Sequence, residues 1–120
     1  MRNDIDAFEE RTKSFAIGVI RLCAPLEQVP GMRFLSGQLA RSAGSVAANH
    51  RAMRRSRSTR EFAAKLQIVN EEIDESVLWI EIVDEIATEF RAQLTPLLKE
   101  GLELRSMFAA ARSTTRQRLA

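Results

Sequence analysis

The side chains best suited to binding chemistry are five arginines that fall within ten consecutive residues. No acid interrupts this run, whose members are Arg51, Arg54, Arg55, Arg57 and Arg60. Planar guanidinium groups suit phosphate oxygens, and several together give affinity for nucleic acid that depends on salt rather than on sequence. No aromatic residue lies within the run, so stacking on bases has little support. The alternative interpretation is a solvated turn whose arginines offset the negative end of the preceding helix.

Residues able to carry out catalysis are scarce. The chain has one His, His50, and one Cys, Cys23. A di-iron helical bundle needs Glu-x-x-His pairs on facing helices, and a nucleophilic site needs a base beside its nucleophile. The acids from Glu71 to Glu75 have no neutral ligands beside them, which favours a solvated or salt-bridged helix face over a metal site. The sequence therefore predicts no enzyme activity, no metal and no cofactor.

Charge is distributed unevenly along the chain. The net charge of +2, from 18 basic and 16 acidic residues, is too small to argue for nucleic acid alone. The basic run is followed by a stretch, Glu71 to Glu89, that contains many acids and no base. This segregation indicates either a layer of salt bridges between helices or two partner surfaces of opposite sign.

No signal peptide or membrane-spanning run is recognisable. The single cysteine excludes an internal disulfide, and its place on an apolar stripe favours a buried structural thiol. We therefore expect a cytoplasmic location and no membrane partner.

One long helix, from Ser58 to about Ala87, is the element around which the chain is arranged. Ser58 and Glu61 have the spacing of a capping box. An apolar stripe then follows at helical spacing: Phe62, Leu66, Val69, Ile73, Val77 and Ile80. No Gly or Pro interrupts it before Arg91, so nothing local ends the helix.

Three further helices are predicted. The first runs from Asn3 or Asp4 to Leu26, and the loop that follows covers residues 27–31. Its buried face consists of Ile5, Phe8, Thr12, Phe15, Val19, Leu22 and Leu26. The second spans Met32 to about Arg54, and the fourth begins between Arg91 and Thr95, where Thr95-Pro96 resembles a cap. We expect residues 113–120 to be a frayed polar tail.

Two surfaces on these helices predict close packing or assembly. Small residues recur every four positions on the second helix and predict a groove that another helix approaches closely: Ser36, Ala40, Gly44, Ala48 and Ala52. On the long helix, extra apolar residues widen the stripe beyond what a single bundle buries, which predicts an oligomer interface anchored by Trp79: Leu78, Trp79, Ile82 and Ile86. A wide core-facing helix is the alternative.

The overall prediction is one all-α domain, residues 1–120, folded as an antiparallel up-down four-helix bundle because the helices are joined by short connections.

The sequence also resembles a known bacterial family of four-helix-bundle proteins. Its members were first noticed as reading frames in intervening sequences of large-subunit ribosomal RNA genes, and accessory variability proteins of diversity-generating retroelements are related to them. The likeness is carried by Gln38-Leu39-Ala40-Arg41-Ser42-Ala43, Ser45-Val46-Ala47-Ala48-Asn49, Ser58, Glu61-Phe62, Leu66, Ile68 and Glu75. His50-Arg51-Ala52-Met53 stands where the family has Ile-Ala-Glu-Gly, and Glu71-Glu72 where it has Gly-Ser.

This resemblance implies a ring-like homopentamer without enzyme activity. The retroelement members bind nucleic acid and a reverse transcriptase. Arg41 and Glu75 both belong to the shared pattern, and we expect them to form a buried ion pair that fixes helix register.

The functional hypothesis is a non-catalytic, homo-oligomeric scaffold whose arginine run binds RNA, DNA or a partner protein that handles nucleic acid. The alternative is a pure protein–protein interaction module, in which the arginines of one subunit meet the acidic helix of its neighbour.

Overall fold

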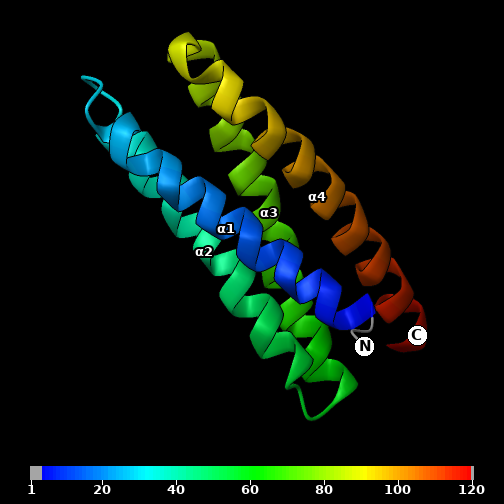
Figure 1. Cartoon of the computed structure of the whole chain (residues 1–120). Helices are drawn as coiled ribbons and strands as arrows, with labels where there is room; N and C mark the ends of the chain where they lie inside the picture. The colour runs from blue at the N-terminus through cyan, green and yellow to red at the C-terminus, as the bar shows by residue number, and fades with distance from the viewer. Residues whose placement is uncertain (1–3, 120) are drawn as a thin grey trace.

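The computed structural model describes residues 4–119, which form four long helices and one short helical turn. The helices are α1 (Asp4–Glu27), α2 (Arg33–Arg54), α3 (Thr59–Ile86) and α4 (Arg91–Leu119), and the 3-10 turn η1 (Thr88–Phe90) joins α3 to α4. Each long helix packs on the one before it and runs antiparallel to it (Figure 1). The all-α class and the antiparallel succession of four helices are therefore confirmed.

The expected start of α3 is confirmed in atomic detail. Ser58 has an extended backbone, and its hydroxyl oxygen accepts a hydrogen bond of 3.0 Å from the N–H of Glu61. The Glu61 carboxylate accepts in return from the N–H of Arg57, at 3.5 Å, one residue before the expected donor. The two bonds give partners to the backbone N–H groups of Arg57 and Glu61, at a helix start where such groups are otherwise unpaired. They hold the short turn between α2 and α3 in place.

The core is built from the apolar stripes that the sequence predicts. Large apolar side chains from all four long helices are completely or almost completely buried, among them Val19, Leu26, Leu39, Val46, Leu66, Ile73, Ile80, Leu104 and Phe108. Burying a side chain of this size stabilises the fold by about 1.5–3 kcal/mol. Thr12 is fully buried at the gap in the α1 stripe, and its hydroxyl donates to the carbonyl of Glu9 at 2.8 Å.

A few buried polar groups fix how the helices pair. Cys23 and Ser36 exchange hydrogen bonds between α1 and α2: the thiol donates to the Ser36 carbonyl at 3.4 Å, and the hydroxyl donates to the Cys23 carbonyl at 3.3 Å. Ser76 of α3 donates to the hydroxyl oxygen of Ser42 of α2 at 2.9 Å. Each bond gives a partner to a polar group that would be costly to bury alone. The bonds therefore favour one alignment of α2 along α1 and along α3.

Two expectations for α1 and α2 are wrong. Ile5 is 56% exposed rather than buried. The stripe of small residues makes a close contact at Ser36, but Ala48 is exposed and a Cβ atom added at Gly44 would meet nothing within 4 Å. A four-residue spacing exceeds one helical turn by about 40° at each step, so the series spirals away from α1 along the helix.

The end of α4 also differs from the prediction. The helix continues to Leu119, through most of the segment expected to fray. Thr115 is buried there, and its hydroxyl donates to the Ala111 carbonyl at 2.8 Å. At the other end α4 starts at Arg91, within the predicted range of Arg91 to Thr95, so Pro96 lies in its second turn rather than at the first helical position.

Candidate nucleic-acid interface

The arginine run lies at one end of the molecule, at the end of α2 and the turn into α3 (Figure 1). The same end holds the start of α1 and the end of α4. Four members of the run are exposed and form no ion pair with any residue in the described range 4–119: Arg51, Arg55, Arg57 and Arg60. Their exposure leaves these four side chains accessible to a ligand.

Arg54 differs from the other four arginines. Its guanidinium group pairs with two carboxylates of α1, at 3.0 Å from Asp6 and 3.2 Å from Glu9. The side chain is 28% exposed. Arg54 therefore fastens the first turns of α1 to the end of α2 and is the member of the run least available to a ligand.

A groove beside the run adds an arginine that the sequence reasoning missed. The groove has a volume of about 380 Å³ and is lined by Met53, Arg54, Ser56, Arg57, Ser58, Thr59, Phe62, Thr115 and Arg118. Arg118 comes from the segment expected to fray, and only the helical continuation of α4 brings it to the α2–α3 turn. The hydroxyl oxygen of Ser56 is buried without a hydrogen-bond partner in the described structure.

The acids of α3 pair with helices of the same chain. Arg105 of α4 lies 3.1 Å from Asp74, Arg91 lies 3.0 Å from Asp84, and Arg41 of α2 lies 3.2 Å from Glu72. Of the two interpretations of the charge segregation, salt bridges between helices are therefore present. Their basic partners are arginines outside the run.

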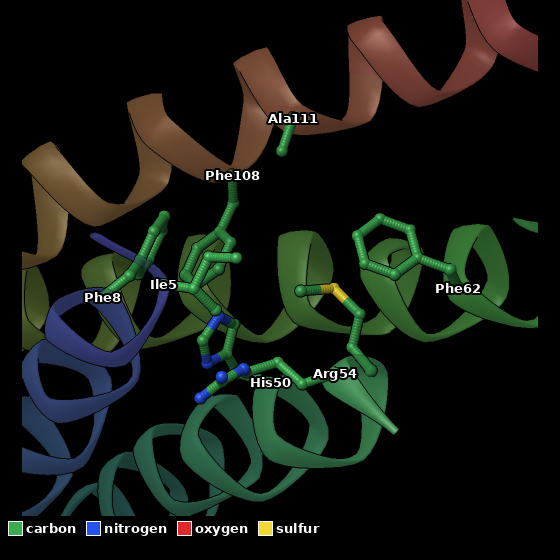
Figure 2. Close-up of a pocket in the computed structure, with 8 residues that line it drawn as sticks. Ile5, Phe8, His50, Arg54, Phe62, Phe108 and Ala111 are labelled. Carbon is green, nitrogen blue, oxygen red and sulfur yellow. The ribbon is translucent and has the colours of Figure 1, made fainter. Parts of the chain in front are cut away.

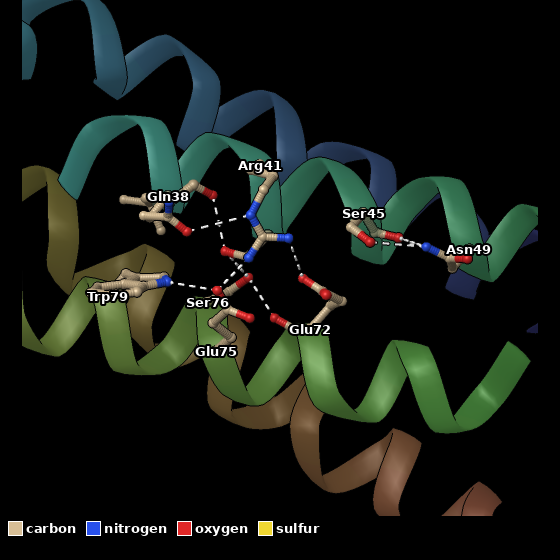
Figure 3. A network of polar contacts seen from close by, with 10 residues as sticks. Gln38, Arg41, Ser45, Asn49, Glu72, Glu75, Ser76 and Trp79 are labelled. Atoms are coloured by element: carbon tan, nitrogen blue, oxygen red, sulfur yellow. Dashed lines mark hydrogen bonds and ion pairs between the residues drawn. The ribbon is translucent and has the colours of Figure 1, made fainter. Parts of the chain in front are cut away.

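Arg41 is the centre of a polar network between α2 and α3 (Figure 3). Its guanidinium group hydrogen-bonds to Glu75 as well as to Glu72, and the indole N–H of Trp79 donates to Glu75 at 3.1 Å. The pKa of Glu75 is lowered, first by the Trp79 hydrogen bond and then by Arg41. The pair lies at the surface, with side chains 48% and 32% exposed, and not in the core as expected.

The apolar candidates on α3 are partly exposed. Leu78 is 49% and Ile86 58% exposed, whereas Trp79 and Ile82 are half-buried. The Trp79 ring meets the ring of Phe34 edge to face, with centroids 6.0 Å apart. Phe34 is 66% exposed and was not predicted as part of this surface. The result is an apolar area that extends from α3 onto the start of α2.

Three further observations concern metal, thiol and membrane sites in the part of the chain that the structure describes. Among residues 4–119, no three His, Cys, Asp or Glu side chains gather closely enough to hold a metal ion. Cys23 is buried, and burial raises the pKa of its thiol. None of the described helices combines the length and the apolar character needed to cross a membrane.

Comparison with known proteins gives a match at the level of structure. No protein-family model matches the sequence, and no curated protein is significantly similar to it. The fold is similar to that of a protein of unknown function from the S23 ribosomal protein family of Bacteroides thetaiotaomicron, with a TM-score of 0.80 and 23% identity. The match covers 88% of this chain and 97% of that one. This family is that of the intervening-sequence proteins, so the resemblance stated from sequence is confirmed for the fold.

Proposed function

We propose that this chain is a non-catalytic, homo-oligomeric scaffold that binds the phosphate backbone of RNA or DNA. The binding surface is the basic rim, which we define as Arg51, Arg55, Arg57, Arg60 and Arg118. Its partners are other copies of the chain and a nucleic acid, or a protein that handles nucleic acid.

The observation that carries this proposal is the contrast between paired and unpaired arginines. Several other arginines have carboxylate partners, and one of them, Arg54, lies in the run itself: Arg11, Arg41, Arg54, Arg91 and Arg105. The rim arginines have none among residues 4–119, although they crowd together at one end. Clustered like charges repel one another, and the cluster is relieved by a polyanion that several guanidinium groups contact together.

Assembly would strengthen a rim that is weak in a single chain. The net charge of +2 is small, but several copies would present several rims to one nucleic acid, and the second contact would then form at a high effective concentration. The exposed side chains of Phe34, Leu78 and Ile86 support self-association. A pentamer is the number that the family resemblance implies.

The test is fluorescence anisotropy with random-sequence RNA and DNA oligonucleotides across a range of salt. We expect affinity to fall steeply as salt rises, and the double variant Arg55→Ala/Arg57→Ala to lose about one unit of log–log salt slope per phosphate contact removed. The matched control is Arg21→Ala/Arg33→Ala, which removes the same charge at the opposite end of the molecule. Equal effects of the two double variants, or no salt-dependent binding by the unaltered chain, would contradict the proposal.

The alternative, a protein-interaction module, has its own expected result. Nothing would bind the oligonucleotides, and Arg55→Ala/Arg57→Ala would instead reduce the mass of the assembly in solution. The pairing of Glu72, Asp74 and Asp84 with arginines of their own chain leaves fewer acids for a neighbouring subunit. A nucleic acid is therefore a better partner for the rim than the acidic helix of a neighbouring subunit.

A further inference from the structure

An apolar cavity lies directly beside the basic rim, where all four long helices contribute to one end of the molecule (Figure 2). Its volume is about 410 Å³, and it is lined by Ile5, Phe8, His50, Met53, Arg54, Phe62, Phe108 and Ala111. Sites for small organic ligands typically measure about 300–1,000 Å³ and are mostly apolar with a few polar groups. Met53, Arg54 and Phe62 also line the groove of Arg57 and Arg118, so the cavity and the groove lie against the same three side chains.

Aromatic rings form the walls of this cavity. Figure 2 shows Phe62 on one side, and Phe108, Ile5 and His50 on the other, with Ala111 of α4 above the space between them. Phe8 packs against this second wall, with its ring centroid 4.9 Å from that of Phe108 and 5.0 Å from that of His50. The arginine run has no aromatic residue of its own, but Phe62 follows it by two residues on α3, and the fold brings Phe8 of α1 and Phe108 of α4 to the same place. Flat aromatic faces stack well on nucleobases.

His50 supplies an unused hydrogen-bonding group in this wall. The residue is only 3% exposed, and its Nδ1 atom is buried without a partner in the described structure. Burial lowers the pKa of the imidazole, and this effect is larger than the opposing effect of the Glu9 charge. The positive charge of Arg54 lowers the pKa further. A neutral imidazole offers one donor and one acceptor, which suits the edge of a nucleobase.

The adjoining groove has the chemistry of a phosphate site. Its lining contains three arginines and no acid, together with the start of α3 and the unpartnered hydroxyl of Ser56. Arg57 and Arg118 have no ion pair within residues 4–119, whereas Arg54 is held by Asp6 and Glu9. The Glu61 carboxylate lies at the α3 start, where it accepts from the Arg57 N–H. Two free guanidinium groups beside a helix start favour a bound anion.

We propose that the cavity and the groove together bind one unpaired nucleotide. The base stacks on the partly exposed ring of Phe62 and hydrogen-bonds to His50, and its phosphate lies between Arg57, Arg118 and the Ser56 hydroxyl. The inference rests on the proposed function in treating the rim as a nucleic-acid surface, and it adds a preference for single strands and strand ends, because bases in a duplex are already stacked and paired. A free nucleoside monophosphate carries the same chemistry.

The first experiment uses the fact that His50 is the single histidine of the chain. Its ring resonances in an NMR spectrum can therefore be assigned without ambiguity. We expect adenosine 5′-monophosphate to shift them in a saturable manner, adenosine to do so at higher concentration, and inorganic phosphate to leave them in place. Resonances that do not respond to adenosine 5′-monophosphate would overturn the inference.

The second experiment fills the cavity while the arginines stay in place. Ala111→Phe puts a ring into the space, and Ala110→Phe is the matched control because Ala110 is exposed on the same helix. We expect the unaltered chain to bind a single-stranded oligonucleotide roughly tenfold more tightly than a blunt duplex, since stacking of one base supplies that much. Ala111→Phe should remove the difference, and Ala110→Phe should keep it. If Ala111→Phe does not fold by circular dichroism, Phe62→Leu takes its place.

The outcomes separate the two proposals. Equal, salt-dependent binding of single strand and duplex by the unaltered chain would overturn the nucleotide site and leave the rim intact. Binding of adenosine 5′-monophosphate without any oligonucleotide binding would support the nucleotide site, identify the free mononucleotide as its ligand, and overturn the rim. A single-strand preference that survives Ala111→Phe would overturn the cavity as its cause.

Discussion

At the scale of single residues, His50 is the most unusual side chain of the fold. It is a titratable ring with almost no exposure, packed between Phe8 and Phe108. The charged groups that face it are Glu9 of α1 and Arg54 of its own helix, while the residues of α3 and α4 at the cavity are apolar. Its environment therefore favours the uncharged ring.

This environment predicts a pH dependence of stability. Burial lowers the pKa of His50 in the folded state below the unfolded value, so the folded chain binds fewer protons than the unfolded chain on the acid side of that value. The free energy of unfolding therefore has its full value above the unfolded pKa of about 6.5. It decreases as the pH falls below that value and through the lower folded pKa. Urea denaturation at about pH 7.5 and about pH 5.5 should show a lower midpoint in acid, and His50→Phe should remove part of this change. An NMR titration of His50 that gives an ordinary or raised pKa would contradict the assignment.

At the scale of helices, the glycines distinguish tight packing from open space. A Cβ atom at Gly101 would lie 3.2 Å from Val77 and 3.4 Å from Phe15, whereas one at Gly44 would meet nothing within 4 Å. Gly44→Ala should therefore stabilise the chain by about 0.5–1 kcal/mol, because alanine is the better helix former. Gly101→Ala should give a smaller gain or none. Denaturant unfolding of both variants tests the difference, and a destabilising Gly44→Ala would mean that another helix occupies this face after all.

How much of the fold could be predicted depends on how local the signals are. The ends of α2 and α3 lie within one residue of those predicted, because the caps and the apolar stripes are properties of neighbouring residues. The partner of Arg54 could not be predicted, since Asp6 is 48 positions away and many other acids compete. The cavity beside the rim was equally inaccessible, because its aromatic walls come from separate helices and none lies in the arginine run.

At the scale of the whole molecule, the apolar area around Phe34 and α3 is the feature that predicts assembly. We expect the unaltered chain to have a mass in solution of several 13.5 kDa subunits. Leu78→Glu/Ile86→Glu should reduce this mass to that of a single chain, because two charges would be buried without partners. Light scattering at low and high salt measures it.

The control for assembly lies on α1, where Ile17 and Ile20 are exposed to a similar degree. Ile17→Glu/Ile20→Glu should leave the mass unchanged. The opposite result, in which only the α1 variant dissociates, would move the interface to α1. A mass that falls in high salt without any substitution would indicate that the arginines hold the assembly together.

The position of the chain ends has a practical consequence. The first turn of α1 and the last turn of α4 lie at the same end of the molecule as the arginines (Figure 1). An affinity tag added before α1 or after α4 would therefore be attached at the end of the molecule that carries the proposed binding surface, and a polyhistidine tag would add signals to a spectrum in which His50 is otherwise the single histidine. A circular permutant opened in the α1–α2 loop, with the old termini joined by a short linker, would move any tag to the far end.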